Sequence, residues 1–382
     1  MCTGIKTTIR QVTILFLVIF FSVLSCRKDK VIIESETEDL TPQEITSVKG
    51  LYLLNEGTMG RNNATLDYFD YAAGKYHRNI YAEKNPQVVK GLGDVGNDLK
   101  IYGSKMYAVI NCSNLVEVMS ASDARHITSF EVLNCRYITF HKGKAYVSSY
   151  AGPVELNTNK NIGVVLEFDT VDFRMTRKVE VGYQPEEMAV VNGKLYVANS
   201  GGYTSLDYDH TVSVIDLETF TEIKKIDVDI NLHHLKADSY GDIYVSSRGD
   251  HAGKGSSLYV IDTGTDKVKT SIEIGATNFC IMGDTAYVFG SDYNSLTGKS
   301  TLSYNMVDVK TEALLPGRFI TDGTDIQQPY GIAVDPVSRD IYVTDAKKYT
   351  ISGTLYCFDK HGKKKSDVTT GYTPAHIAFL PK

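Results

Sequence analysis

A tyrosine that recurs along most of the chain is the feature that most constrains the fold. Each copy follows a hydrophobic residue and begins an apolar run, as in the stretches at 106–110 and 195–198. The seven copies are Tyr52, Tyr107, Tyr146, Tyr196, Tyr244, Tyr287 and Tyr342, so successive copies are 55, 39, 50, 48, 43 and 55 residues apart. This spacing is typical of the four-stranded blades of a β-propeller. The repeat therefore predicts seven blades.

The order of segments inside one unit predicts four strands. In the unit at 187–228, a short apolar strand at 187–191 is followed by the turn Asn192-Gly193 and the tyrosine strand from residue 194. A polar loop leads to a third strand at 211–216, and a turn leads to a fourth at 223–228. Apolar and polar residues alternate in these segments, which is the strand period. After residue 50 no apolar stripe has the length of a helix.

The two ends of the repeat predict how the ring closes. The first unit begins directly at Gly50 and lacks an opening strand, whereas a spare strand at 374–379 follows the last unit. This spare strand matches those that follow Gln184-Pro185 and Gln328-Pro329. We therefore expect an all-β fold, a seven-bladed β-propeller in which the C-terminal strand closes the first blade. Closure would remove exposed sheet edges.

The first residues are typical of a lipoprotein signal peptide. Lys6 and Arg10 precede an apolar stretch at 12–24 that is too short to span a bilayer. It ends at Ser25-Cys26, which resembles the lipobox of bacterial lipoproteins and predicts lipidation of Cys26. We expect a signal peptide at 1–25, the lipidated cysteine with a flexible, acid-rich tether at 26–47, and the propeller at 48–382. The predicted location is the outer membrane, lipid-anchored and exposed at the cell surface, with the lipid as the one membrane contact.

Charge and cysteine content exclude several classes of partner. The chain has a net charge of −6, and loss of the two cations of residues 1–25 would make it −8. Without a stripe of basic residues, nucleic acid is not an expected partner. The four cysteines after Cys26 show no CxxC spacing, so we expect no metal site. Cys112 and Cys135 are a possible disulfide, and the alternative is two free, partly buried thiols.

Long polar loops after each tyrosine strand predict a ligand-binding face. These loops and the connections that enter each innermost strand gather on one side of a propeller, and they carry Tyr, amide, Arg and His side chains. Such a rim suits a large neutral ligand with amides or hydroxyls. The candidate ligand-binding residues are Glu56, Arg61, Asn97, Asn111, Arg136, Tyr150, Tyr203, Tyr208, His233, Arg248, Tyr293, Tyr330, Tyr349 and His376.

No catalytic residue is expected, because the sequence has no GxSxG, HExxH or phosphate-loop motif. His233 and His234 are adjacent, and neighbouring residues of a strand point to opposite faces, so we expect that they do not share an ion. A third hypothesis is an enzyme of the propeller lactonase or lyase kind. His233 and His376 are the only residues around which its catalytic cluster could form.

Seven stretches resemble one family of known proteins. They lie at 54–57, 62–66, 94–98, 108–114, 149–154, 197–203 and 343–347. They are similar to YncE-like surface lipoproteins of gut Bacteroidota, and most similar to the BtuG-like group. The resemblance implies capture of cobalamin (vitamin B12) on a propeller face and its delivery to a TonB-dependent outer-membrane transporter. Cobalamin is then a transported ligand, and no cofactor is implied. The alternative is a glycan- or protein-binding propeller lipoprotein of the surface-layer type.

Overall fold

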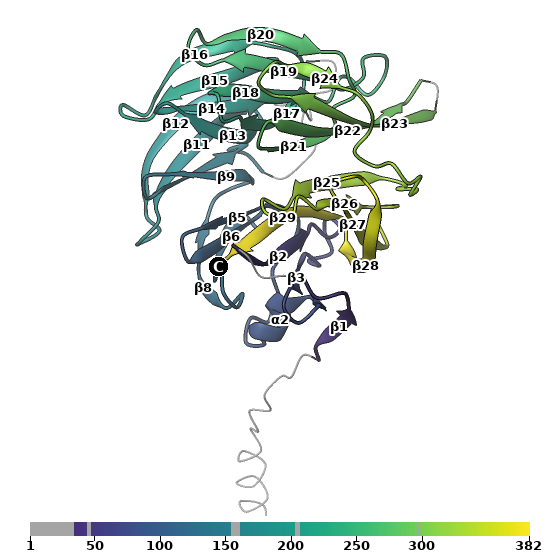
Figure 1. Ribbon diagram of the computed structural model, residues 1–382. Helices are drawn as coiled ribbons and strands as arrows, with labels where there is room; N and C mark the ends of the chain where they lie inside the picture. The colour runs from purple at the N-terminus through teal and green to yellow at the C-terminus, as the bar shows by residue number, and fades with distance from the viewer. Residues whose placement is uncertain (1–33, 44–46, 154–160, 203–206, 297) are drawn as a thin grey trace, which may run out of the picture. The chain divides into compact units, whose positions relative to one another are not determined.

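The protein is a seven-bladed β-propeller. The computed structural model describes residues 34–382 except 44–46, 154–160, 203–206 and 297. Its strands form seven antiparallel sheets, six with four strands and one with five (Figure 1). In the described part of the chain, no helix is both long and apolar enough to span a membrane. The predicted fold class is confirmed.

Six blades are built from consecutive strands. The second blade contains β5 (Gly96–Tyr102), β6 (Lys105–Ile110), β7 (Leu115–Ser120) and β8 (His126–Glu131). The third contains β9 (Cys135–His141), β10 (Lys144–Ser149), β11 (Ile162–Asp169) and β12 (Met175–Tyr183). The fourth contains β13 (Pro185–Val191), β14 (Lys194–Asn199), β15 (Thr211–Asp216) and β16 (Thr221–Asp227).

The remaining three of these blades follow the same order. The fifth contains β17 (Leu232–Ala237), β18 (Asp242–Ser247), β19 (Ser257–Asp262) and β20 (Lys267–Ile272). The sixth contains β21 (Asn278–Met282), β22 (Thr285–Asn294), β23 (Lys299–Asp308) and β24 (Ala313–Leu315). The seventh contains β25 (Pro329–Val334), β26 (Ile341–Asp345), β27 (Ser352–Phe358) and β28 (Lys364–Tyr372).

The first blade joins the two ends of the ring. Its strands are β29 (Pro374–Pro381), β2 (Val48–Asn55), β3 (Thr65–Asp70), β4 (Lys75–Arg78) and β1 (Glu36–Asp39). β29 lies antiparallel to β2, with Leu53 opposite Ile377. The predicted closure by the C-terminal strand is therefore confirmed. A short helix, α2 (Ile80–Lys84), lies in the connection from this blade to the second.

The fifth strand of the first blade corrects the expected tether. Residues 36–39, placed within a flexible segment at 26–47, form β1 and pair with β4. Their acidic side chains contact cations on β4: Glu36 lies 3.1 Å from Arg78, and Asp39 lies 2.6 Å from Lys75. The acid-rich stretch therefore belongs to a sheet. Residues 26–33 lie outside the described residues.

The repeated tyrosines are packing residues between blades. Six of the seven are almost completely buried, and Tyr287 is partly buried. Several hydroxyls reach the next blade: Tyr52 donates to the Ala121 carbonyl at 3.0 Å, and Tyr244 donates to the Val309 carbonyl at 3.1 Å. The repeat that predicts the fold is thus a structural device that joins neighbouring blades.

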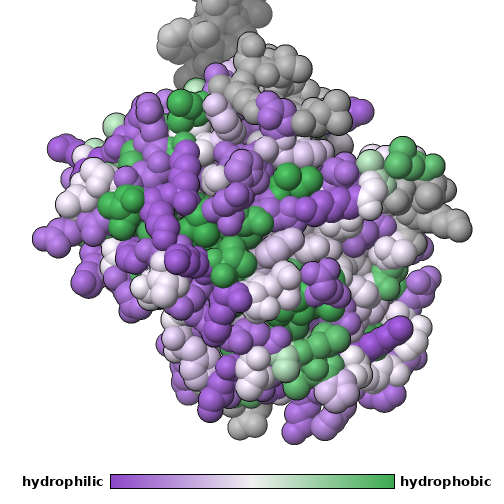
Figure 2. Space-filling model, turned by 90° about the horizontal axis from the view of Figure 1, so that it is seen from above, coloured by the Kyte–Doolittle hydropathy of each residue, from purple (hydrophilic) through white to green (hydrophobic). Residues whose placement is uncertain are grey.

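On the face shown in Figure 2, hydrophobic residues lie in small groups among hydrophilic ones.

Register shifts at the start of the innermost strands control what faces the centre. They occur in β5, β9, β13, β17, β25 and β29. In β17, Leu232 lies opposite Ser247 and Leu235 lies opposite Val245, so His233 and His234 together face one residue. A bulge of this kind re-aims side chains and breaks the strict alternation of a strand. Consecutive polar residues can therefore face the same cavity.

Candidate ligand-binding site

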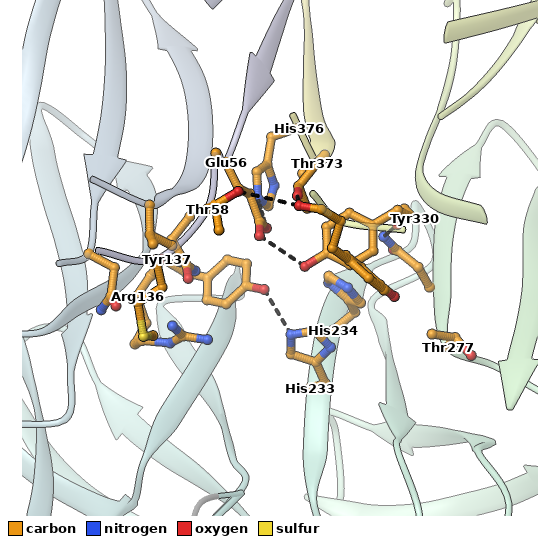
Figure 3. Close-up of a pocket in the computed structure, with 18 of the residues that line it drawn as sticks. Glu56, Thr58, Arg136, Tyr137, His233, His234, Thr277, Tyr330, Thr373 and His376 are labelled. Carbon is orange, nitrogen blue, oxygen red and sulfur yellow. Dashed lines mark hydrogen bonds and ion pairs between the residues drawn. The ribbon is translucent and has the colours of Figure 1, made fainter. Parts of the chain in front are cut away.

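A cavity of about 410 Å³ lies where the innermost strands begin, and most of the predicted site residues line it. It is bordered by the ends of second strands and by the starts of innermost strands, as the loop pattern predicts (Figure 3). The structure brings nine of the fourteen candidates together in its wall: Glu56, Asn97, Asn111, Arg136, His233, Arg248, Tyr330, Tyr349 and His376.

The other five candidates are not among the residues of this wall. Tyr203 lies outside the described residues, Arg61 is exposed, and Tyr208 is half-buried. Tyr150 is buried beneath the wall, where its hydroxyl contacts Glu186. Tyr293 is 57% exposed because β22 and β23, each ten residues long, continue as a hairpin where we expected a loop. The lengths of these loops indicated the face of the propeller that they share. They did not indicate which of their side chains reach the cavity.

Among the lining residues that were absent from the candidate set are Tyr137 and His234. The expectation that His233 and His234 point to opposite faces is wrong, because the bulge in β17 turns both into the cavity. Their ring centroids are 4.0 Å apart. A second bulge does the same for Arg136 and Tyr137 in β9. The sequence signal that could have identified Tyr137 and His234 is the pair of consecutive polar residues at the start of the innermost strand, in β9 and in β17.

A buried carboxylate joins two arginines beneath the cavity. Glu186, at the start of β13, lies 3.0 Å from Arg136 and 3.4 Å from Arg248. Glu186 also accepts from the Tyr150 hydroxyl at 2.5 Å, and the Arg136 guanidinium lies over the Tyr150 ring. The fourth blade thus supplies an anion that orients cations from the third and fifth blades. These cations are held in place before any ligand arrives.

The neighbouring residue, Glu187, forms a second buried network. It accepts from His234 at 2.9 Å and from Lys236 at 2.7 Å, and Lys100 lies 3.7 Å away. Burial opposes ionisation of Glu187, but Lys236, His234 and Lys100 outweigh it and hold its pKa well below the usual range. Burial lowers the pKa of His234, and Glu187 only partly offsets this effect.

A third network lies in the wall itself. The Tyr330 hydroxyl donates to Glu56 at 2.9 Å, and His376 lies 3.3 Å from the other oxygen of Glu56. Tyr137 contacts His233 at 2.9 Å (Figure 3). Burial, reinforced by His234 and Arg248, lowers the pKa of His233 well below its ordinary value. Burial and then Glu56 raise the pKa of Tyr330, so these two groups are neutral at neutral pH.

The four cysteines in the described part of the chain, Cys112, Cys135, Cys280 and Cys357, are free thiols. The possible disulfide between Cys112 and Cys135 is not formed: Cys112 is half-buried, and Cys135 is buried. The Cys135 thiol contacts the Leu115 carbonyl at 3.4 Å, and burial raises its pKa to about 12. The alternative of two free thiols is the one observed. Among the described residues, no group of three or more His, Cys, Asp or Glu side chains could hold a metal ion.

Comparison with solved structures supports the fold alone. Hydrazine synthase of Kuenenia stuttgartiensis has a TM-score of 0.60 and 14% identity, with 75% of this chain and 90% of that chain covered. A quinonprotein alcohol dehydrogenase-like protein of Bacteroides thetaiotaomicron has a TM-score of 0.57 and 15% identity, covering 88% and 79%. Apo AztD of Citrobacter koseri has a TM-score of 0.53 and 13% identity, covering 88% and 99%.

Sequence comparison identifies the family. Among curated proteins, none matches this sequence. One family model, described as Domain of unknown function (DUF5074), matches residues 49–380, which include nearly all of the strands described above. The propeller and its central cavity thus lie within the matched region, and the chain belongs to the DUF5074 family.

Proposed function

We propose that this protein binds a ligand at the central cavity without transforming it, and that the ligand is cobalamin. The observation that carries the proposal is the pairing of the cavity's ionisable groups with one another. Glu186 is shared by two arginines, Glu187 contacts His234, and Glu56 contacts Tyr330 and His376. These groups offer fixed hydrogen-bond donors and acceptors. A rigid set of this kind loses little entropy on binding.

The chemistry of the wall supports an amide-rich ligand. Asn97, Asn111 and Asn278 come from two different blades, and Tyr330 and Tyr349 come from a third. Amides and phenols can donate to and accept from the amide arms of cobalamin without covalent chemistry. A corrin ring with its arms is larger than a cavity of about 410 Å³. Cobalamin would therefore lie across the rim, with one part inserted.

The contacts of the two histidines disfavour an enzyme. A general base must reach a proton of the substrate. His233 contacts Tyr137, and burial followed by the neighbouring cations disfavours its protonation, whereas His376 contacts Glu56. Both therefore serve internal networks. We therefore expect that substitution of both histidines abolishes no enzymatic reaction.

We also propose that Cys26 carries a lipid anchor in the outer membrane and that the ligand passes to a TonB-dependent transporter. The signal-peptide pattern and the family resemblance support these steps. Cell fractionation tests the anchor: a Cys26→Ser protein should leave the membrane fraction. Retention of that variant in the membrane would refute lipid anchoring.

Calorimetric titration of residues 27–382 with cyanocobalamin tests the ligand. We expect tight one-to-one binding, and Arg248→Gln should weaken it about tenfold because a fixed charged donor is lost. Arg174→Gln is the matched control, because that arginine is exposed on the β11–β12 turn, away from the cavity. No heat with cyanocobalamin at micromolar concentration would refute the assignment. Heat with a glycan instead would favour the surface-layer alternative.

A further inference from the structure

One side of the cavity is an aromatic platform. Tyr349 lies in the loop after β26, lines the cavity and is 41% exposed. Its ring meets the Tyr330 ring edge-on, with centroids 5.7 Å apart. Met59, 61% exposed, lies in the same wall. Two rings and a thioether thus offer an accessible apolar surface next to buried polar groups.

The backbone at Tyr349 is held in an unfavourable conformation. Its φ of 60° lies in the left-handed region, which is uncommon for a bulky residue. The Tyr349 amide donates to the Ala346 carbonyl at 2.8 Å. The Tyr349 carbonyl accepts from the hydroxyls of Thr58 at 3.4 Å and Thr373 at 3.3 Å. Strain that the surroundings enforce is typical of ligand-contacting loops. These contacts hold the Tyr349 backbone at the mouth of the cavity.

The loop is itself tied to the rigid sheet. The Asp345 carboxylate accepts from the backbone amides of Gln327, Gln328 and Lys347 at 2.8–3.1 Å. The Ala346 amide also donates to the Gln328 carbonyl at 2.9 Å. The exposed tyrosine therefore stands on a supported loop. An aromatic surface that is already ordered gains more from stacking, because little side-chain entropy is lost.

The other side of the cavity carries cations. Arg136 and Arg248 converge on Glu186, and Figure 3 shows Arg136 and Tyr330 on opposite sides of the cavity. Arginine is suited to phosphate because its planar donors match the oxygens. Asn97 and Asn278 add amides to the wall between them. The cavity therefore combines surfaces for an aromatic ring, an anion and hydroxyl groups.

Size decides which part of a ligand can enter. A cavity of about 410 Å³ lies near the lower end of the range of roughly 300–1,000 Å³ for pockets that enclose small ligands. A corrin ring does not fit, whereas a base joined to a ribose and a phosphate does. We infer that the cavity is a subsite for a nucleotide-like group, with the base on Tyr349 and the phosphate at Arg136 and Arg248. This inference rests on the proposed function and identifies the inserted part of cobalamin as its nucleotide loop.

Calorimetry with three probes tests the subsite. The probes are cyanocobalamin, dicyanocobinamide (which lacks the nucleotide) and the free dimethylbenzimidazole ribotide. Tyr349→Asn removes the ring while keeping a residue that tolerates the left-handed conformation. Because stacking of a base on an aromatic ring contributes strongly, we expect this variant to bind cyanocobalamin about tenfold more weakly. Binding of dicyanocobinamide should be weaker from the start and unchanged in the variant.

Tyr240→Asn is the matched control. Tyr240 is 50% exposed and contacts Asp284 outside the cavity, so its substitution should change no affinity. Thermal unfolding of both variants checks that the propeller is intact. Equal affinity for the two corrinoids, or an equal loss for both in Tyr349→Asn, would overturn the subsite and leave cobalamin capture standing.

The remaining outcomes separate the two proposals. Binding of the free ribotide alone, abolished by Tyr349→Asn, would support the nucleotide subsite and refute cobalamin as the ligand. A free nucleotide would then be the source of the same chemistry. Absence of binding by all three probes would overturn both the subsite and the proposed function.

Discussion

At the scale of single residues, the repeated tyrosines differ in whether the hydroxyl is hydrogen-bonded. Tyr196 donates to Asp266 at 2.6 Å and also contacts the Thr263 carbonyl. Tyr107 is equally buried, but its hydroxyl has no hydrogen-bond partner among the described residues. The ring packs between blades in both cases. The hydroxyl should therefore matter in only one of them.

We predict that Tyr196→Phe lowers the free energy of unfolding by about 1–2 kcal/mol, because Asp266 loses a buried donor. Tyr107→Phe should be neutral or slightly stabilising, since it removes a desolvated hydroxyl that makes no bond. Urea denaturation of the two variants measures the difference. An equal loss in both would show that the hydroxyl contributes nothing specific at Tyr196.

At the scale of strands, the two ends of the chain contribute unequally to the first blade. β29 pairs along the length of β2 and carries buried residues such as Ala375 and Leu380. β1 is four residues long, lies at the outer edge, pairs only with β4 among the described strands, and its side chains add exposed ion pairs. Exposed ion pairs contribute little to stability. The inner strand should be indispensable and the outer one dispensable.

We predict that deletion of residues 374–382 prevents cooperative folding, because it exposes the edge of β2 and opens the ring. Deletion of residues 26–39 is the matched control and should leave a folded propeller with slightly reduced stability. Circular dichroism during thermal unfolding, with gel filtration for aggregation, distinguishes the two. A cooperative transition in the protein without β29 would contradict the need for closure.

Strands also show how far the sequence could predict the structure. Blade number followed from the tyrosine spacing, which expresses the blade repeat directly, and closure followed from the spare strand at 374–379, which has no partner within the last unit. The side-chain directions of His233 and His234 did not follow, because a one-residue bulge changes the face of the sheet to which the next residues point. The hairpin that carries Tyr293 away from the cavity and the pairing of β1 depend on register between segments, which composition does not encode.

At the scale of the whole molecule, the buried charges connect blades that are distant in sequence. Glu187 in the fourth blade contacts His234 and Lys236 in the fifth and lies near Lys100 in the second. The pKa of Glu187 is held below its ordinary value of 4.5 by Lys236, His234 and Lys100, against the effect of burial. Burial lowers the pKa of both His233 and His234 below 6.5. Acid should therefore weaken the centre of the ring in two steps.

The direction in which stability changes with pH follows from proton uptake on unfolding. Each histidine binds a proton more readily in the unfolded chain, so its contribution is complete above pH 6.5 and declines as the pH falls below that value. The contribution of Glu187 to stability is complete above pH 4.5 and is lost as the pH falls further.

We predict that the free energy of unfolding in urea is constant near pH 8, decreases below pH 6.5 and decreases more steeply below pH 4.5. His233→Gln should make the first decline shallower, whereas His361→Gln, at an exposed turn, should leave the profile unchanged. A flat profile between pH 8 and pH 5, or the same slope in both variants, would show that the central histidines are not the groups that acid titrates.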